Sequence, residues 1–180
     1  ALDMALKERR PLDELLVPLD HAIANSPAHP EYAYTKIDWL SQAFRVTADR
    51  SYAEQAQSEI LRIKFYEPYD RQILLAQYRN LKDLQEYIRA IAVLEEGITK
   101  FPWDIKFYEA AIMEYAENGR KLQDTDPATA DSYWDRGMQL YEEVLRRMEM
   151  LEALPEEQWQ GRNFHVTPFL RQAIGQIYYA

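Results

Sequence analysis

The sequence predicts an all-α protein in which antiparallel helix pairs stack into a right-handed superhelix, or solenoid. Three observations support this fold class. Prolines follow apolar helical segments at three similar places, and two of them, Pro68 and Pro102, are 34 residues apart. Apolar residues recur in one register around each proline, as expected for a repeat protein. The chain also has only five glycines in 180 residues, which favours helices with short connections over a β-sandwich.

The composition limits the chemistry open to the chain. Apolar residues make up 47% of it and its net charge is −9, as in a globular protein that stays in solution. Phosphate binding needs clustered Lys and Arg, so the acidic balance disfavours nucleic acid as a partner. The absence of cysteine excludes disulfides, thiolate catalysis and Cys-ligated zinc. No segment has the run of about 18 apolar residues that a membrane helix needs.

We interpret residues 1–180 as a single repeat domain with joints near Pro27, Pro68 and Pro102. Proline cannot continue a helix and disfavours helical geometry in the residue before it. The interval from Pro27 to Pro68 is seven residues longer than the next, and we assign the extra residues to the polar stretch 45–50. Pro18 falls inside the first helix, which we therefore expect to be kinked or to start later.

The interior positions agree with this register. The first helix of each pair should bury three sets of residues: Ala33, Ile37 and Leu40; Leu74, Tyr78 and Leu81; Tyr108, Ile112 and Tyr115. The second helices carry their own triplets at constant spacing: Leu15, Leu19 and Ala22; Ala56, Ile60 and Ile63; Ala90, Leu94 and Gly97. Small residues there let helices approach closely. This length and pattern are typical of the tetratricopeptide repeat.

Polar residues and glycine mark the expected helix ends. Asp70 and Asp104 each lie two residues after a joint proline, where they can cap the next helix. Gly119 is expected to close the first helix of the third pair, before a polar insert at 120–131. A degenerate fourth repeat then covers 131–154 as one over-long helix, in which Gly137, Tyr141 and Val144 repeat the small-large-small spacing.

The last segment, 167–180, is expected to form a terminal helix without a partner. Thr167 can cap it and Pro168 can occupy its first position. Its apolar stripe contains Leu170, Ala173, Ile174, Ile177 and Tyr178. Terminal repeats normally end with a polar outer face. We therefore expect the chain to be a fragment of a longer protein, or this helix to be covered by a second copy in a homodimer.

Residues that carry chemistry are few, and we assign no catalytic residue, metal or cofactor. His21 and His29 are expected on the surface, and His165 in a loop-ordering role. The adjacent acids Glu95-Glu96, Glu142-Glu143 and Glu156-Glu157 point in different directions on a helix, so we interpret them as solvated. The 13 tyrosines and four tryptophans are assigned mostly to the core.

A concave groove is the surface where such a fold binds partners. Helix residues of the same register that are not packed inward should line it, namely Tyr34, Asp38, Gln72, Leu75, Arg79, Lys106, Glu109 and Met113. These residues include apolar groups, which can supply affinity, and charges of both signs, which can fix how a partner is aligned in the groove. Such a mixture suits a protein or peptide partner. The alternative, that these are simply solvated helix residues, is left open.

Three phrases carry a more specific resemblance: AHPEYAYTKIDWL, LEEGITKFPWDIKFYEAAIMEY and LEALPEEQWQGRNFHVTP. They resemble the soluble C-terminal tetratricopeptide-like region of bacterial O-antigen ligase/polymerase-family membrane proteins. The resemblance implies a non-catalytic scaffold domain that takes part in surface-polysaccharide assembly. Parts of the parent protein that are not in this sequence would tether the domain to the plasma membrane. The resemblance leaves open on which side of that membrane the domain lies. The alternative is a free-standing cytoplasmic repeat protein that binds a peptide or regulator. A helical carbohydrate-active enzyme is disfavoured, because no carboxylate pair is placed for it.

Overall fold

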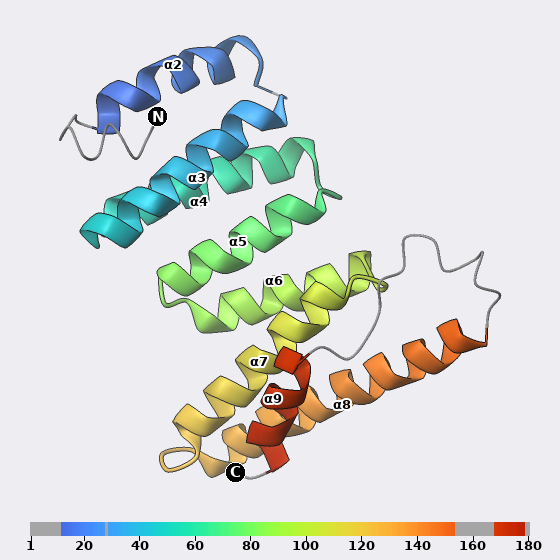
Figure 1. Cartoon of the computed structure of the whole chain (residues 1–180). Coiled ribbons are helices and arrows are strands. Elements are labelled where there is room, and N and C mark those ends of the chain that lie inside the picture. The colour runs from blue at the N-terminus through green and yellow to red at the C-terminus, as the bar shows by residue number, and fades with distance from the viewer. Residues whose placement is uncertain (1–11, 28, 154–167, 179–180) are drawn as a thin grey trace. The chain divides into compact units, whose positions relative to one another are not determined.

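The computed structural model describes residues 12–27, 29–153 and 168–178, and all of its regular structure is α-helical (Figure 1). The described ranges contain eight helices, and within each of the two units described below successive helices pack against one another. This confirms the all-α class and the sequential packing. The chain divides into two compact units, Ala1–Glu86 and Tyr87–Ala180, each of which is described by itself.

Unit 1 contains four described helices: α2 (Leu12–Asn25), α3 (Pro30–Thr47), α4 (Arg50–Tyr66) and α5 (Arg71–Asp83). Helices α3, α4 and α5 each pack on the helix before them. One core cluster, built around Leu16, Leu40 and Ala56, joins α2, α3 and α4. A second cluster, built around Ile37 and Ile60, extends to α5.

Unit 2 also contains four described helices: α6 (Tyr87–Lys100), α7 (Ile105–Leu122), α8 (Pro127–Glu152) and α9 (Pro168–Tyr178). Helix α7 is at its centre and contacts each of the other three. It is correspondingly apolar on several sides, with fully buried Phe107, Tyr108 and Ile112. The boundary between the units falls between α5 and α6, which the sequence assigned to one repeat.

The joint prolines lie between helices, and the predicted caps are present. Pro68 lies between α4 and α5, and Pro102 between α6 and α7. Asp70 accepts hydrogen bonds from the backbone N–H groups of Gln72 and Ile73. Asp104 accepts one from the N–H of Lys106, at 3.1 Å. Both carboxylates therefore satisfy backbone donors that a helix start leaves unpaired.

The predicted core register is also confirmed. Eight of the nine first-helix positions are buried, and Tyr78 is half-buried. Among the second-helix positions the two later triplets, from α4 and α6, are buried, whereas Leu15, Leu19 and Ala22 of α2 are half-buried. Among the described helices α2 packs mainly against α3, in agreement with this lower burial.

A start of the first helix after Pro18 is excluded, and two expected helix boundaries are wrong. Helix α2 runs through Pro18. The stretch 45–50 is mostly helical, because only Ala48, in a left-handed conformation, and Asp49 separate α3 from α4. The extra residues of this pair therefore lengthen its helices, which have 18 and 17 residues.

Gly119 gives the second boundary error, because it lies inside α7 and is buried there. A Cβ at this position would overlap with the Trp134 indole of α8. Glycine is therefore needed for close approach, not for ending the helix. The polar insert at 120–131 is shortened accordingly, because α7 continues to Leu122 and α8 begins at Pro127.

Helix α9 begins at Pro168 as predicted, while Thr167 lies outside the described residues. Three residues of its apolar stripe, Leu170, Ala173 and Ile174, are buried, because α9 packs on both α7 and α8. Ile177 is half-buried. The homodimer through this helix stays a prediction. The over-long α8 is confirmed, with 26 residues ending at Glu152.

Candidate functional site

Unit 1 has a hollow between α3 and α5. Five α3 residues and two α5 residues line it, namely Ile37, Asp38, Ser41, Gln42, Arg45, Ala76 and Arg79. Its volume is about 120 Å³. Two of the predicted groove residues, Asp38 of α3 and Arg79 of α5, thus line the same hollow, although they are 41 residues apart in the sequence.

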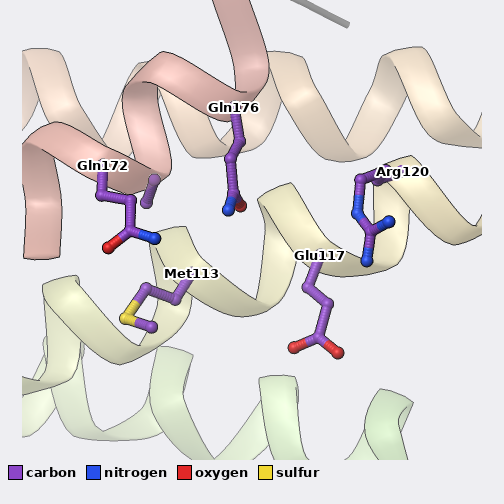
Figure 2. A pocket seen from close by; sticks show the side chains of 6 residues that line it. Met113, Glu117, Arg120, Gln172 and Gln176 are labelled. Atoms are coloured by element: carbon purple, nitrogen blue, oxygen red, sulfur yellow. The ribbon is translucent and has the colours of Figure 1, made fainter.

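Unit 2 has a hollow between α7 and α9, with a volume of about 200 Å³ (Figure 2). Met113, Glu117 and Arg120 of α7 line one side. Gln172, Ala173 and Gln176 of α9 line the other. Met113 is the predicted groove residue found here, and 44% of it is exposed.

The two hollows have the same construction. In each, the first helix contributes residues at positions i, i+4 and i+7, which are Asp38, Gln42 and Arg45 in unit 1 and Met113, Glu117 and Arg120 in unit 2. The second helix contributes an alanine and the residue three positions later, Ala76 and Arg79 or Ala173 and Gln176. Such spacings lie on one face of a helix. Equivalent helix faces therefore form a hollow in each unit.

The remaining predicted groove residues do not line these hollows. Gln72 and Lys106 are exposed, while Leu75 and Glu109 are half-buried. Tyr34 is half-buried and its hydroxyl donates a hydrogen bond to Asp70. Burial and this bond to a carboxylate raise the pKa of Tyr34. Its position ties α3 to the start of α5.

Sequence reasoning missed the residues one and two turns further along each first helix. These are Gln42 and Arg45 in unit 1, and Glu117 and Arg120 in unit 2. The register itself contains the signal, because i+4 and i+7 continue the face that Asp38 and Met113 begin. The glutamines of α9 were missed because that helix was treated only as an apolar stripe.

The arginines of the hollows differ from most other cations of the chain. Ion pairs engage Lys36, Arg50, Arg62, Lys100, Lys121, Arg136 and Arg147. Within the described residues, Arg79 and Arg120 have neither a hydrogen bond nor an ion pair. Arg45 has none there either, although its charge opposes the rise that burial causes in the pKa of Asp83. These guanidinium groups keep their donors available in the hollows.

Two of the acid pairs are not simply solvated, which corrects the sequence interpretation. Glu95 accepts hydrogen bonds from Tyr115 at 2.9 Å and from Arg136 at 2.9 and 2.7 Å. Glu143 accepts from Tyr108 and Arg147. Burial together with the hydrogen bonds to carboxylates raises the pKa of Tyr108 and of Tyr115 to about 12. These carboxylates hold helices together, and Glu156-Glu157 lies outside the described residues.

The aromatic residues are less buried than expected. Only Tyr108 and Tyr115 are buried among the described tyrosines, and Tyr32, Tyr66 and Tyr69 are exposed. Phe65 is 81% exposed beside Tyr66, with 5.3 Å between the ring centroids. The core is therefore mainly aliphatic, and several aromatic rings lie at its edge or outside it.

The histidines and acids of the described ranges do not form a metal centre. His21 and His29 are exposed, as predicted, and His165 falls outside those ranges. No group of three or more His, Asp or Glu side chains is arranged to hold a metal ion in the part of the chain described. None of the described helices has the length and apolar character needed to cross a membrane.

Comparisons with family models, curated proteins and solved structures find no match to this chain. The structure therefore defines a class, an all-helical protein with sequentially packed helices, and the comparisons identify no family.

Proposed function

We propose that the chain is a non-catalytic, tetratricopeptide-like interaction domain that binds extended segments of partner proteins. The observation that supports this function most directly is the repeated hollow. Equivalent faces of α3 and α7, each with one neighbouring helix, present polar and apolar groups in a recess. A repeated recess suits a ligand that itself has repeating side chains, such as a polypeptide.

The sizes of the hollows favour side chains over whole small molecules. Ligand pockets for small molecules are typically about 300–1,000 Å³. The hollows measure about 120 Å³ and about 200 Å³, which suits one or two side chains each. The lining includes a positive charge, a negative charge and an apolar contact, from Arg79, Asp38 and Met113. The apolar contact can supply affinity, and the charges can fix the alignment of the bound segment.

The superhelix and the cellular setting are further parts of the proposal. Helix pairs of nearly constant register, separated by proline joints, support a right-handed solenoid. The resemblance to the soluble region of O-antigen ligase-like proteins supports a scaffold role in bacterial surface-polysaccharide assembly, with a membrane tether elsewhere in the parent chain. The alternative remains a free-standing cytoplasmic binding protein. Sequencing the parent gene distinguishes them, because the first setting requires several hydrophobic spans beside this domain.

Selection from a random 12-residue peptide display library tests the interaction function. We expect peptides whose saturable binding is weakened by Arg79→Glu or Met113→Glu, since both side chains are exposed and line hollows. Arg146→Glu, an exposed site on α8 away from the hollows, provides the matched control. Selected peptides that bind all four proteins equally would reject the hollows as the binding surface, and hydrolase or transferase turnover by the purified chain would reject the non-catalytic assignment.

A further inference from the structure

Two glutamines of α9 project into the hollow of unit 2. Gln172 and Gln176 are exposed, and Figure 2 shows their carboxamides on the side of α9 that faces α7. Neither carboxamide is hydrogen-bonded to the described part of the chain. Each therefore offers an N–H donor and a carbonyl acceptor to a ligand in the hollow.

The spacing of these two groups matches an extended polypeptide. Residues four apart on a helix are separated by about 6 Å along its axis. Residues two apart in an extended chain are separated by about 6.6–6.8 Å. A carboxamide presents a donor and an acceptor side by side, as the N–H and C=O of a single residue in an extended chain do. Two such groups at this spacing can pair with residues i and i+2 of one extended segment.

The remaining lining defines which side chains the segment carries. Met113 and Ala173 supply the apolar part of the lining. Arg120 has no ion pair within the described residues, whereas Glu117 is paired with Lys121 at 2.8 Å. Lys121 offsets the negative charge of Glu117, so the uncompensated charge of the hollow is that of Arg120. An acidic side chain beside an apolar one complements this arrangement.

We propose that the unit 2 hollow binds an extended, acidic segment of a partner protein, with Gln172 and Gln176 on its main chain and Arg120 on a carboxylate. This assignment rests on the proposed interaction function and specifies its ligand. Main-chain recognition by the glutamines sets the extended conformation. Arg120 selects acidic sequences, and Met113 contacts an apolar side chain of the segment.

The test uses a labelled, end-capped peptide of eight residues in which glutamate alternates with valine, a residue that favours extended chains. Binding to the full chain is measured by fluorescence anisotropy. Three related peptides isolate the interactions: glutamine in place of glutamate, lysine in place of glutamate, and N-methylation of alternate backbone nitrogens. The N-methylated peptide keeps every side chain but loses the N–H donors that the glutamines require.

We expect the Gln172→Ala/Gln176→Ala protein to bind the glutamate peptide about tenfold more weakly, and N-methylation to have a similar effect. Arg120→Ala should weaken binding of the glutamate peptide about fivefold and leave binding of the glutamine peptide unchanged. Gln55→Ala on α4 and Arg171→Ala on α9 provide matched controls, because both residues are exposed and neither lines the hollow. Circular dichroism verifies that each variant keeps its helical content.

Several outcomes overturn the assignment. Equal affinity of the N-methylated peptide excludes main-chain recognition, and an unchanged affinity of the double glutamine variant excludes the site. Stronger binding of the lysine peptide reverses the charge assignment. Binding of a synthetic peptide of residues 154–167, or an Arg120-dependent dimer in light scattering, assigns the hollow to the chain itself. If display-selected peptides bind the hollows but the alternating peptide does not, this inference fails while the interaction function stands.

Discussion

Unit 2 buries glycines as well as alanines inside its helices, whereas unit 1 contains no glycine. In unit 1 the small residues Ala33, Ala53 and Ala56 are fully buried. All five glycines of the chain lie in the range of unit 2, and Gly97, Gly119 and Gly137 are buried inside its helices. The neighbouring groups explain the difference, since a Cβ at Gly97 would overlap with Phe107 and one at Gly119 with Trp134.

The comparison shows that the same register can be packed in two ways. Buried alanines suffice in unit 1, whereas in unit 2 the rings of Phe107 and Trp134 occupy the space that a Cβ on Gly97 or Gly119 would need. At Gly137 the aliphatic Ile177 occupies that space. Glycine in a helix costs about 0.5–1 kcal/mol relative to alanine, so its use is offset here by ring burial. The polar groups of the hollows differ as well. The unit 1 hollow has two arginines, one carboxylate and one carboxamide, and the unit 2 hollow has one arginine, one carboxylate and two carboxamides.

The largest expected effect comes from filling a ring-covered glycine. Gly119→Leu should lower the free energy of unfolding by about 3 kcal/mol, because the new side chain competes with the Trp134 indole for the same space. Urea unfolding followed by far-ultraviolet circular dichroism measures the change.

Gly175→Ala provides the matched control for this substitution. Gly175 also lies in a helix of unit 2, but a Cβ there has nothing within 4 Å. We expect no loss, or a gain of up to about 1 kcal/mol from helix propensity. Equal destabilisation by both changes would show that contact with the Trp134 ring does not account for the cost of filling Gly119.

Asp70 carries the next largest effect, because in unit 1 one carboxylate has two roles. It caps α5 and accepts the Tyr34 hydroxyl of α3. Asp70→Ala should cost about 2 kcal/mol, of which the cap and the hydroxyl bond account for about 1 kcal/mol each. Tyr34→Phe removes the second part only. In a double-mutant cycle the combined variant should be no less stable than Asp70→Ala, and full additivity would contradict the coupling.

Much of the fold could be predicted because it depends on local spacing. The buried positions Ala33, Leu74 and Tyr108 follow from helical periodicity, and the caps follow from an aspartate two residues after a proline. Gly119 was misread because a glycine after an apolar helix usually marks its end, and the deciding contact with Trp134 comes from the next helix. Local sequence contains no sign of that contact.

The candidate site was predictable only in part for the same reason. Asp38, Arg79 and Met113 were found because their register places them on an outward face. Whether a residue on that face borders a recess depends on the neighbouring helix, and this excluded Tyr34 while including Arg45. The partners of Glu95 and Glu143 were also hidden, because Arg136 of α8 and Tyr108 of α7 lie 41 and 35 residues away in sequence.

Lys36 tests whether charge contributes to helix packing in unit 1. Its ammonium group bonds to Asp20 of α2 at 2.6 Å and to Glu59 of α4 at 2.9 Å, with 13% of its side chain exposed. Lys36→Met should cost between about 1 and 2 kcal/mol, since it leaves Glu59 short of a partner. Lys121→Met removes an exposed pair in unit 2 and should change stability by less than about 0.5 kcal/mol. Equal effects would mean that burial of the pair is irrelevant.

Glu143 gives the smallest expected effect and the clearest pH dependence in unit 2. Burial alone would raise its pKa, but hydrogen bonds from Arg147 and Tyr108 outweigh it and hold the pKa below the ordinary value. A carboxyl group whose folded-state pKa is lowered adds stability above its unfolded-state pKa, near 4.3, and loses it as pH falls through the folded-state pKa.

Glu143→Gln should therefore cost about 1 kcal/mol at pH 7, and this difference should shrink as pH falls below about 4. Glu142→Gln, at the exposed neighbouring site, should match the unsubstituted protein across that range, as measured by urea unfolding at each pH. A constant difference from pH 7 to pH 3 for Glu143→Gln would show that the effect comes from packing of the side chain, because loss of an ionised acceptor must disappear once the acceptor is protonated.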